Sequence, residues 1–208
     1  RVMRIQHYGW EAMETTDTGR KDHQHGLRVI REWVVVVGVA LAIALLVRGF
    51  LLQQFYISGP SMESTMFQDN RVLVNKLSYR LHGIGRGDVV VFDRITTDGE
   101  VVQHDDLIKR VIALPGESIE IRECVVFIDG KELLEPYLND YDLKQVNLED
   151  RCRVPELEPV EISSGHIFVM GDNRPQSFDS RMFGEIETDL VVGRAFTLIW
   201  PLSNARWL

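Results

Sequence analysis

The stretch Leu107-Ile-Lys-Arg-Val-Ile-Ala-Leu114 has the β-branched, apolar composition of a strand. Alternate side chains of a strand point to the same face, so Lys109 would share an apolar face with Leu107 and Val111. Desolvation on that face disfavours the charged ammonium and lowers its pKa. Lowering the pKa from about 10.4 to about 8 costs roughly 3 kcal/mol and gives a usable amine base. The alternative is a lysine whose side chain reaches solvent at the sheet edge.

Short apolar runs broken by turn residues lie on both sides of this stretch. They cover residues 71–75, 88–92, 118–121, 124–128, 166–170 and 190–200. Turn pairs such as Pro115-Gly116 separate them, and after residue 54 no stretch has the 3.6-residue apolar period of a helix. The sequence therefore predicts a mainly β, antiparallel sandwich or barrel-like domain over residues 54–208. The polar stretch 139–162 is predicted to be a long surface excursion.

A continuous apolar run precedes this domain. Residues 33–47 are fifteen apolar residues without interruption, and Arg48-Gly-Phe-Leu-Leu52 extends the run. About 20 apolar residues span the hydrocarbon core of a membrane, so residues 31–53 are predicted to form a transmembrane helix. A buried core helix or a cleaved signal peptide fits less well, because the run has no polar face and bulky residues follow it.

Positive charge predicts the orientation of this helix. The twenty residues before Trp33 contain four Lys or Arg, whereas the eighteen after Leu52 contain none. The positive-inside rule places residues 1–30, a predicted flexible tail, in the cytoplasm. The β domain would then lie on the outer side of the cell membrane.

The charge of the β domain argues against nucleic acid as a partner. The whole chain has a net charge of −8, and residues 54–208 contain sixteen Lys or Arg against twenty-six Asp or Glu. Nucleic-acid binding needs a basic surface, which this composition does not provide.

Cys124 and Cys152 are the only cysteines, and both fall in the predicted outer domain. An oxidising compartment permits a disulfide between them. Two separate thiols fit the sequence equally well, because spacing along the chain does not give the distance between two cysteines.

Ser61 is a candidate nucleophile, in Ile57-Ser-Gly-Pro-Ser-Met-Glu-Ser-Thr-Met66 just beyond the apolar run. Gly59 and Pro60 give the backbone a fixed turn before the hydroxyl, a geometry that can direct backbone N–H groups at an oxyanion. By itself, however, a serine after Gly-Pro is usually an ordinary loop serine.

A third cluster is Gly171-Asp-Asn-Arg-Pro-Gln-Ser-Phe-Asp-Ser-Arg181, here called the Gly-Asp-Asn-Arg loop, which follows the predicted strand 166–170. Its acidic and basic residues alternate closely, which favours a turn held by ion pairs over a freely solvated run. Its two serines, Ser177 and Ser180, could orient a neutral amine.

Taken together, these segments resemble bacterial type I signal peptidases. Residues 58–66 are similar to that family's Ser-Met-x-Pro-Thr-Leu nucleophile motif. The family's next two strands, its catalytic-lysine strand and its Gly-Asp-Asn-Arg box resemble residues 71–76, 86–92, 108–117 and 171–181. Five motifs in family order are much more specific than any one of them.

The resemblance implies a serine endopeptidase that needs no cofactor and no metal. Ser61 would be the nucleophile and Lys109 the general base, with an acyl-enzyme intermediate. Ser177 would hydrogen-bond the lysine, while Asp179 and Arg181 would brace the loop. The substrates would be signal peptides of exported preproteins, cut after small residues in an Ala-x-Ala pattern, close to membrane lipid and the export machinery.

The resemblance also implies a fold and a substrate pocket. The fold would be two antiparallel sheets with an SH3-like catalytic barrel and an exposed apolar surface facing the membrane. The pocket for the small residue before the cut would be lined by Ile57, Met62, Met66 and Ile108, and Phe55 would help to line the next pocket.

Two positions depart from the family pattern. Ser64 stands in place of the proline of the nucleophile motif, which loosens the turn but removes no catalytic atom. Gly59 occupies a position where some members have a serine in the oxyanion hole. Oxyanion stabilisation would then depend chiefly on the backbone N–H of Ser61, with the Ser58 hydroxyl as a substitute.

Three other interpretations compete with a signal peptidase. A self-cleaving repressor-type Ser–Lys protease would carry a DNA-binding helical domain in place of the apolar run. A histidine-based serine protease would need His104 or His166 close to Ser61. A membrane-tethered, non-catalytic β-domain that binds exported chains would have no need of Ser61 and Lys109 together.

Overall fold

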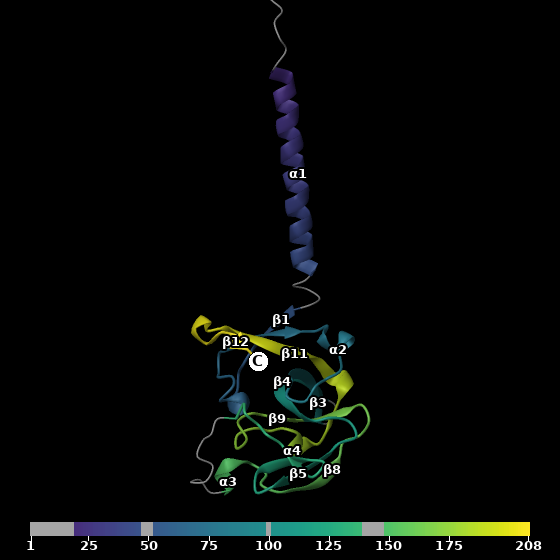
Figure 1. Ribbon diagram of the computed structural model, residues 1–208, viewed down its shortest axis with the longest axis vertical. Coiled ribbons are helices and arrows are strands. Elements are labelled where there is room, and N and C mark those ends of the chain that lie inside the picture. The colour runs from purple at the N-terminus through teal and green to yellow at the C-terminus, as the bar shows by residue number, and fades with distance from the viewer. Residues whose placement is uncertain (1–18, 47–51, 99–100, 139–147) are drawn as a thin grey trace, which may run out of the picture. The chain divides into compact units, whose positions relative to one another are not determined.

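The computed structural model describes residues 19–46, 52–98, 101–138 and 148–208, and the chain divides into two compact units (Figure 1). The first unit, Arg1–Leu46, contains the helix α1 (Gly19–Leu46). The second unit, Val47–Leu208, contains every described strand.

The helix differs at both ends from the predicted span of 31–53. It begins at Gly19, within the predicted tail, and it ends at Leu46. Leu52 and Gln53 do not belong to a helix, because they begin the strand β1 (Leu52–Tyr56) and pair with β2. Residues 1–18 of the predicted tail and residues 47–51 of the predicted helix lie outside the described residues.

The described side chains of α1, over residues 29–45, are exposed. Trp33 is 66% exposed and Leu45 is 69% exposed, although both are strongly apolar. Within the described residues, no helix combines the length and the hydropathy that a membrane crossing requires.

Two antiparallel sheets build the second unit. The larger sheet has the order β1-β2-β11-β3-β4-β9-β10, with β12 paired to β11, and the smaller has the order β7-β6-β5-β8. The remaining strands of the larger sheet are β2 (Arg71–Asn75), β3 (Val89–Asp98), β4 (Val101–Ala113), β9 (His166–Met170), β10 (Ile186–Glu187), β11 (Val191–Trp200) and β12 (Arg206–Trp207). Those of the smaller sheet are β5 (Ser118–Arg122), β6 (Val125–Ile128), β7 (Lys131–Glu132) and β8 (Leu157–Glu161). The predicted mainly β, antiparallel fold is confirmed, whereas the SH3-like barrel stays a prediction.

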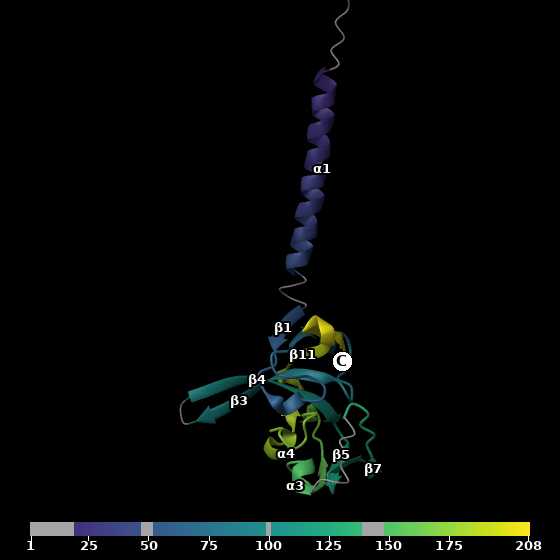
Figure 2. The same ribbon diagram turned by 90° about the vertical axis from the view of Figure 1, so that its left-hand side faces the viewer.

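Strands β3 and β4 form a long ribbon that projects from the rest of the second unit (Figure 2). They pair in continuous register from Val89 opposite Arg110 to Asp98 opposite Val101. The sequence predicted only the inner part of each strand. In the outer part, residues 93–96 and 103–106 are not buried, and it is a buried face that gives a strand its sequence signature.

Alternation of side chains places the core. In β2 and β5 every second residue is buried, so the buried apolar side chains of each strand lie on one face. The nucleophile segment, β2, β3 and β11 contribute to one buried cluster, and the smaller sheet packs Ile119 and Ile121 against Ile112 and Phe168 in another.

The predicted surface excursion 139–162 is corrected in part, because it contains the edge strand β8, which pairs with β5. The sequence did not indicate this strand, because it contains polar side chains and Pro159. An edge strand tolerates polar residues and proline, since one side of its backbone is not paired. Residues 139–147 lie outside the described residues. The short helices α2 (Ser78–Leu81), α3 (Leu148–Arg151) and α4 (Ser180–Phe183) have four residues each, too few to show a helical period.

The two cysteines form a disulfide, which settles the alternative that the sequence left open. Cys124 lies in the two-residue turn that joins β5 to β6, and both Glu123 and Cys124 have positive φ angles, of 48° and 68°. Two such residues in succession are typical of the hairpin turn that matches the twist of the flanking strands. The bond from Cys124 to Cys152 therefore ties this turn to the segment that leads into β8.

Replacing both cysteines by serine is expected to lower the free energy of unfolding by about 3–4 kcal/mol, because the sulfur atoms close a loop whose ends are 28 residues apart. Urea unfolding of the purified protein, with and without reductant, measures this difference. Reductant should leave the stability of the double-serine variant unchanged. An equal response of the wild-type protein and the variant to reductant would contradict the prediction.

Candidate active site

The nucleophile candidate Ser61 lies in a 3-10 turn, Pro60–Met62, with proline at its first position. Proline suits this position because its φ is fixed and its missing N–H would have no partner in the turn. Met62 and Met66 are fully buried, and the Met66 N–H donates to the Met62 carbonyl oxygen at 2.8 Å. The buried methionines hold the segment to the core while the serine hydroxyl faces β4.

Gly59, just before this turn, has an extended backbone, and a Cβ added to it would meet no atom within 4 Å. A serine would therefore fit where this chain has glycine. The first N–H groups of a helical turn have no acceptor within the turn, so the N–H of Ser61 could serve an oxyanion.

Lys109, in β4, points at Ser61. Its Nζ donates to the Ser61 Oγ at 2.8 Å and to the Ile108 carbonyl oxygen at 3.0 Å. The side chain is buried, with the residue only 3% exposed, so it does not reach solvent at a sheet edge. Burial lowers the pKa of Lys109 to about 8, although the negative charges of Asp179 and Asp172 act in the opposite direction.

Ser177 is fully buried, but its hydroxyl has no hydrogen-bond partner among the described residues, so the expected bond to Lys109 is not formed. The hydroxyl lies near Asp179, close enough to contribute to the lowered pKa of that carboxyl without reaching the geometry of a standard hydrogen bond.

Asp179 and Arg181 form a buried ion pair within the Gly-Asp-Asn-Arg loop. Both Nε and Nη2 of Arg181 donate to the Asp179 carboxylate at 2.8 Å. Asp179 also accepts from the backbone N–H of Gly171 at 3.0 Å and caps α4 by accepting from the Arg181 N–H. Burial alone would raise the pKa of Asp179, but these bonds and the charge of Arg181 hold it below its usual value.

Asn173 contributes contacts that sequence reasoning did not assign to it. Its backbone N–H donates to the Ser61 carbonyl oxygen at 3.0 Å, and its side-chain Nδ2 donates to the Pro60 carbonyl oxygen at 3.0 Å. Beside it, Gly171 has no room for a side chain, because a Cβ would lie 2.3 Å from the Ser61 carbonyl oxygen and from the Ser177 Oγ. The loop is thus seated directly on the backbone of the nucleophile.

Arg110 was also missed, because its role depends on partners far away in the sequence. It binds Asp172 through two parallel hydrogen bonds, from Nε at 2.9 Å and from Nη2 at 2.7 Å. The Thr65 hydroxyl donates to the same carboxylate. Since Arg110 pairs with Met170 across β4 and β9, the loop starts beside the strand that carries Lys109.

The five predicted pocket residues come together in one apolar cluster. Ile57, Met62 and Met66 are buried members of it, and Phe55 and Ile108 pack against it. Six further members come from β2, β3 and β11, namely Val72, Val74, Val89, Val91, Ala195 and Leu198. Their strands were predicted from the sequence, but nothing in the sequence connected them with a pocket.

The two histidines of the competing protease mechanism have other partners. The Nδ1 of His104 pairs with Asp93 at 2.6 Å on the β3–β4 ribbon, and that of His166 lies 3.1 Å from the Ser164 carbonyl oxygen. The group that contacts the Ser61 hydroxyl in the described structure is an amine.

Comparison with known proteins gives a consistent result. Residues 30–200 match the family "Signal peptidase, peptidase S26". Signal peptidase IB from Staphylococcus aureus (strain MRSA252) is 34% identical over 186 residues, covering 85% of this chain and 92% of the relative. Signal peptidase I from Bacillus licheniformis is 33% identical over 176 residues, covering 84% of this chain and 91% of the relative.

A crystal structure of a signal peptidase I from Enterococcus faecalis is similar as well, with 30% sequence identity and a TM-score of 0.40, covering 54% of this chain and 97% of that one. The family match extends over most of the chain and includes both Ser61 and Lys109. The chain belongs to the signal peptidase family, peptidase S26.

Proposed function

We propose that this chain is a signal peptidase I, a serine endopeptidase that removes signal peptides from exported preproteins, with Ser61 as its nucleophile and Lys109 as its general base. One observation carries the assignment of the two residues. A buried lysine with a pKa of about 8 lies with its Nζ 2.8 Å from a serine Oγ. The relatives from Staphylococcus aureus and Bacillus licheniformis are named signal peptidases, in agreement with this chemistry.

The geometry supports a two-step reaction. Neutral Lys109 accepts the proton of the Ser61 hydroxyl as Oγ attacks the carbonyl carbon of the scissile peptide. The backbone N–H of Ser61 stabilises the resulting oxyanion. The ammonium then gives its proton to the departing amine, which leaves an acyl-enzyme. A water molecule, deprotonated by the same amine, releases the acyl group and restores the serine.

Two buried carboxylates tune the base. Asp172 and Asp179 favour the ammonium form of Lys109, opposing the desolvation that disfavours it. Both are paired with arginines, Asp172 with Arg110 and Asp179 with Arg181. In the proposed mechanism this balance keeps the amine basic enough to take a proton from a hydroxyl, yet largely neutral at mildly alkaline pH.

The apolar cluster supports a preference for small residues before the cut. Ile57, Met62, Met66 and Ile108 are bulky, and they pack in one cluster beside the serine. A large substrate side chain would have to displace packed atoms, whereas alanine would not. We therefore assign these residues to the pocket for the residue before the cut, and Phe55 to the neighbouring pocket.

We also propose that the chain is anchored in the cytoplasmic membrane by the apolar run that starts at Trp33, with its N-terminus in the cytoplasm. The exposed apolar side chains of α1 need a non-aqueous environment, and lipid provides one. A disulfide in the second unit is typical of an oxidising compartment outside the cytoplasm. Export machinery nearby would deliver the preproteins.

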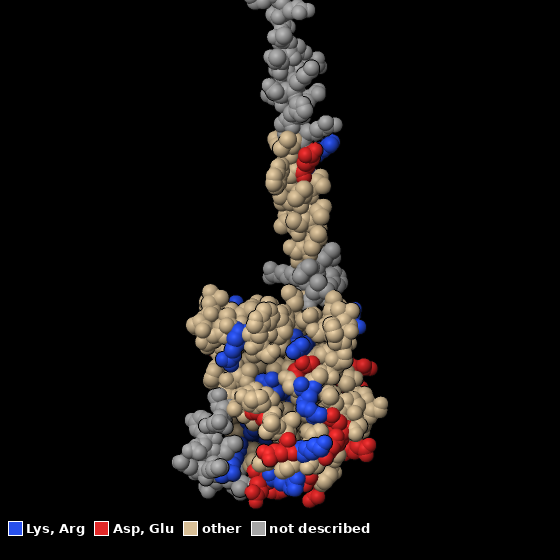
Figure 3. Space-filling view, in the orientation of Figure 1, with Lys and Arg blue, Asp and Glu red and all other residues tan. Residues whose placement is uncertain are grey.

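One end of the second unit is suited to lipid contact. It carries β1 and β12, and on the face shown in Figure 3 its charged side chains are Lys and Arg, whereas acidic side chains gather toward β5 and β8. Exposed apolar residues there include Tyr56, Trp200, Leu202 and Trp207. Aromatic and basic side chains together are typical of surfaces that meet a membrane interface. We propose that this end faces the membrane.

Lys109→Ala is expected to reduce cleavage of an Ala-x-Ala peptide by about three orders of magnitude or more, because the serine loses its base. Lys109→Arg should be equally inactive, since arginine stays charged. A fluorogenic peptide assay on folded, purified proteins measures both. Lys131→Ala, an exposed lysine on β7, is the matched control and should behave like the wild type. Turnover retained in either Lys109 variant contradicts the proposed dyad.

The pH dependence follows from the pKa of Lys109. Because the amine accepts a proton only when neutral, kcat/KM should rise with pH through an apparent pKa of about 8. A profile recorded from about pH 6 to about pH 10 checks this expectation. The result would favour an imidazole base instead if the profile rose through an apparent pKa of about 6.5, the ordinary pKa of histidine, and if this pKa shifted in His104→Ala or His166→Ala.

Enlarging the pocket should broaden specificity. Wild type should prefer alanine over leucine before the cut by about ten- to two-hundred-fold in kcat/KM. Ile57→Ala and Ile108→Ala should narrow this ratio, because each removes bulk from the proposed pocket. Val74→Ala, in the same cluster but not assigned to the pocket, is the control and should leave the ratio unchanged. If neither pocket variant narrows the ratio, the pocket is assigned to the wrong residues.

A further inference from the structure

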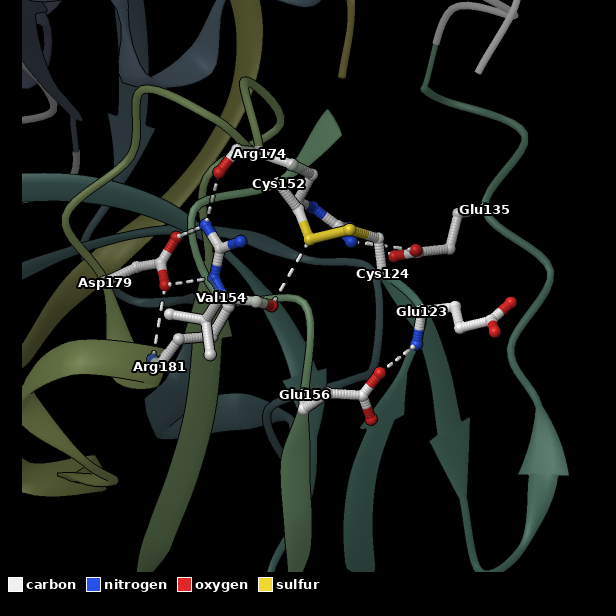
Figure 4. Close-up of a disulfide and its surroundings, with 9 residues drawn as sticks. All are labelled: Glu123, Cys124, Glu135, Cys152, Val154, Glu156, Arg174, Asp179 and Arg181. Carbon is white, nitrogen blue, oxygen red and sulfur yellow. Dashed lines mark hydrogen bonds and ion pairs between the residues drawn. A yellow bond between two sulfur atoms is a disulfide. The ribbon is translucent and has the colours of Figure 1, made fainter. Parts of the chain in front are cut away.

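Glu135 is a nearly buried carboxylate that lies outside every motif used above. It follows β7 of the smaller sheet, and its side chain is 11% exposed. It forms an ion pair with Arg174 of the Gly-Asp-Asn-Arg loop, whose side chain is 8% exposed. Both terminal nitrogens of Arg174 donate to Glu135, Nη1 to Oε2 at 2.9 Å and Nη2 to Oε1. Figure 4 shows the two side chains meeting beside the disulfide.

Arg174 is where several elements of the site meet. Its Nε donates to the Gly171 carbonyl oxygen at 3.1 Å. Its own carbonyl oxygen accepts from the Arg181 Nη2 at 2.8 Å and from the Arg153 N–H at 3.3 Å. Arg153 directly follows Cys152, so the disulfide fastens the same point (Figure 4). Glu135 thus fixes the guanidinium that spans the start of the loop.

The loop residues next to Arg174 pack tightly against the backbone of the nucleophile Ser61. Gly171 is so close to the Ser61 carbonyl oxygen that a Cβ would lie 2.3 Å from it. Asn173, between Gly171 and Arg174, donates to the carbonyl oxygens of Ser61 and Pro60. A shift of the Arg174 guanidinium would therefore move groups that contact the backbone of the nucleophile.

The Glu135 carboxylate also makes a second set of contacts, through Tyr137. The Tyr137 hydroxyl donates to the Glu135 Oε1 at 2.6 Å, and the Tyr137 ring lies under the Arg110 guanidinium, 4.0 Å from its central carbon. Arg110 is the residue next to Lys109 and binds Asp172. Glu135 is therefore connected both to the loop that seats Ser61 and to the strand that carries Lys109.

We propose that Glu135 is a positioning residue for the peptidase reaction, which through Arg174 and Tyr137 holds the Gly-Asp-Asn-Arg loop and β4 at the spacing that brings Ser61 and Lys109 together. The inference rests on the proposed function of the dyad. Removing one partner of a buried ion pair leaves the other charge uncompensated, and Arg174 would move to find new acceptors. A displacement of about 1 Å in the reacting groups can cost a hundredfold in rate.

Glu135→Gln tests the proposal, because it keeps the shape of the side chain and removes its charge. We expect kcat for the Ala-x-Ala peptide to fall about ten- to a hundredfold, with KM changed less than about threefold, since the pocket residues are untouched. Glu132→Gln, exposed on β7 in the same segment, is the matched control and should retain wild-type kcat and KM. Unchanged kcat in folded Glu135→Gln overturns the proposal.

A second variant covers the case in which Glu135→Gln does not fold. Tyr137→Phe removes one donor to Glu135 and keeps the ring on Arg110, so it perturbs the same carboxylate more mildly. We expect a severalfold loss of kcat, about a tenth to a third of the wild-type value remaining. Wild-type kcat in Tyr137→Phe would show that the contact from Glu135 through Tyr137 to Arg110 does not position the site. If Glu135→Gln does not fold, the same result overturns the proposal as a whole.

A double variant separates positioning from stability. Glu135→Leu combined with Arg174→Met replaces the ion pair by apolar groups, which is often neutral for stability. We expect thermal stability close to wild type with kcat still low, because the Gly171 carbonyl oxygen has lost its donor. Recovery of kcat together with stability would show that Glu135 has only a structural role. Lys109→Ala, measured in parallel, tests the dyad separately. If Lys109→Ala retained turnover of the peptide, the proposed function would be wrong, whatever the Glu135 variants show.

Discussion

The site depends on the burial of the Lys109 amine, which is energetically unfavourable for its charged form. Water stabilises an ammonium strongly, so a lysine held away from it releases its proton more readily. In this chain Lys109 is 3% exposed, and burial is the largest influence on its pKa. β4 lies between β3 and β9 in the larger sheet, so its backbone is held on both sides, and the Lys109 side chain is directed at the Ser61 hydroxyl and not at solvent.

The charges around the lysine are arranged in pairs. Asp172 and Asp179 each bind an arginine, and Arg174 binds Glu135, so the buried acids and bases near the site neutralise one another. Isolated, any of these groups would be costly to bury, whereas paired and hydrogen-bonded groups can be accommodated. Their rigidity follows from the same pairing, because an ion pair in a medium of low dielectric constant resists separation more strongly than one in water.

Much of this could be predicted from the sequence, and the limits have physical causes. The strands at 71–75 and 166–170 were placed correctly because each has a buried, β-branched pattern. Alternation in the strand also assigned Lys109 to an apolar face, but it left open whether the side chain was buried or reached solvent at the sheet edge, and the structure shows it buried. By contrast, the contacts of Asn173 and Glu135 join residues whose nearness only the folded chain creates. Polar residues in loops carry no periodic signal. The interleaved charges of the Gly-Asp-Asn-Arg loop indicated a turn held by ion pairs, but they did not indicate which distant groups the loop contacts.

The spacing of the active-site residues along the chain has a consequence for the life of the protein. Lys109 is 48 residues from Ser61, and the bond between Asn173 and Pro60 spans 113 residues. Contacts between such distant segments form late, after the entropy of closing long loops has been overcome. In an incompletely synthesised or partly folded chain, the serine and the lysine of the proposed dyad are therefore not yet brought together. On the proposed mechanism, the long-range topology would delay peptidase activity until the second unit has folded.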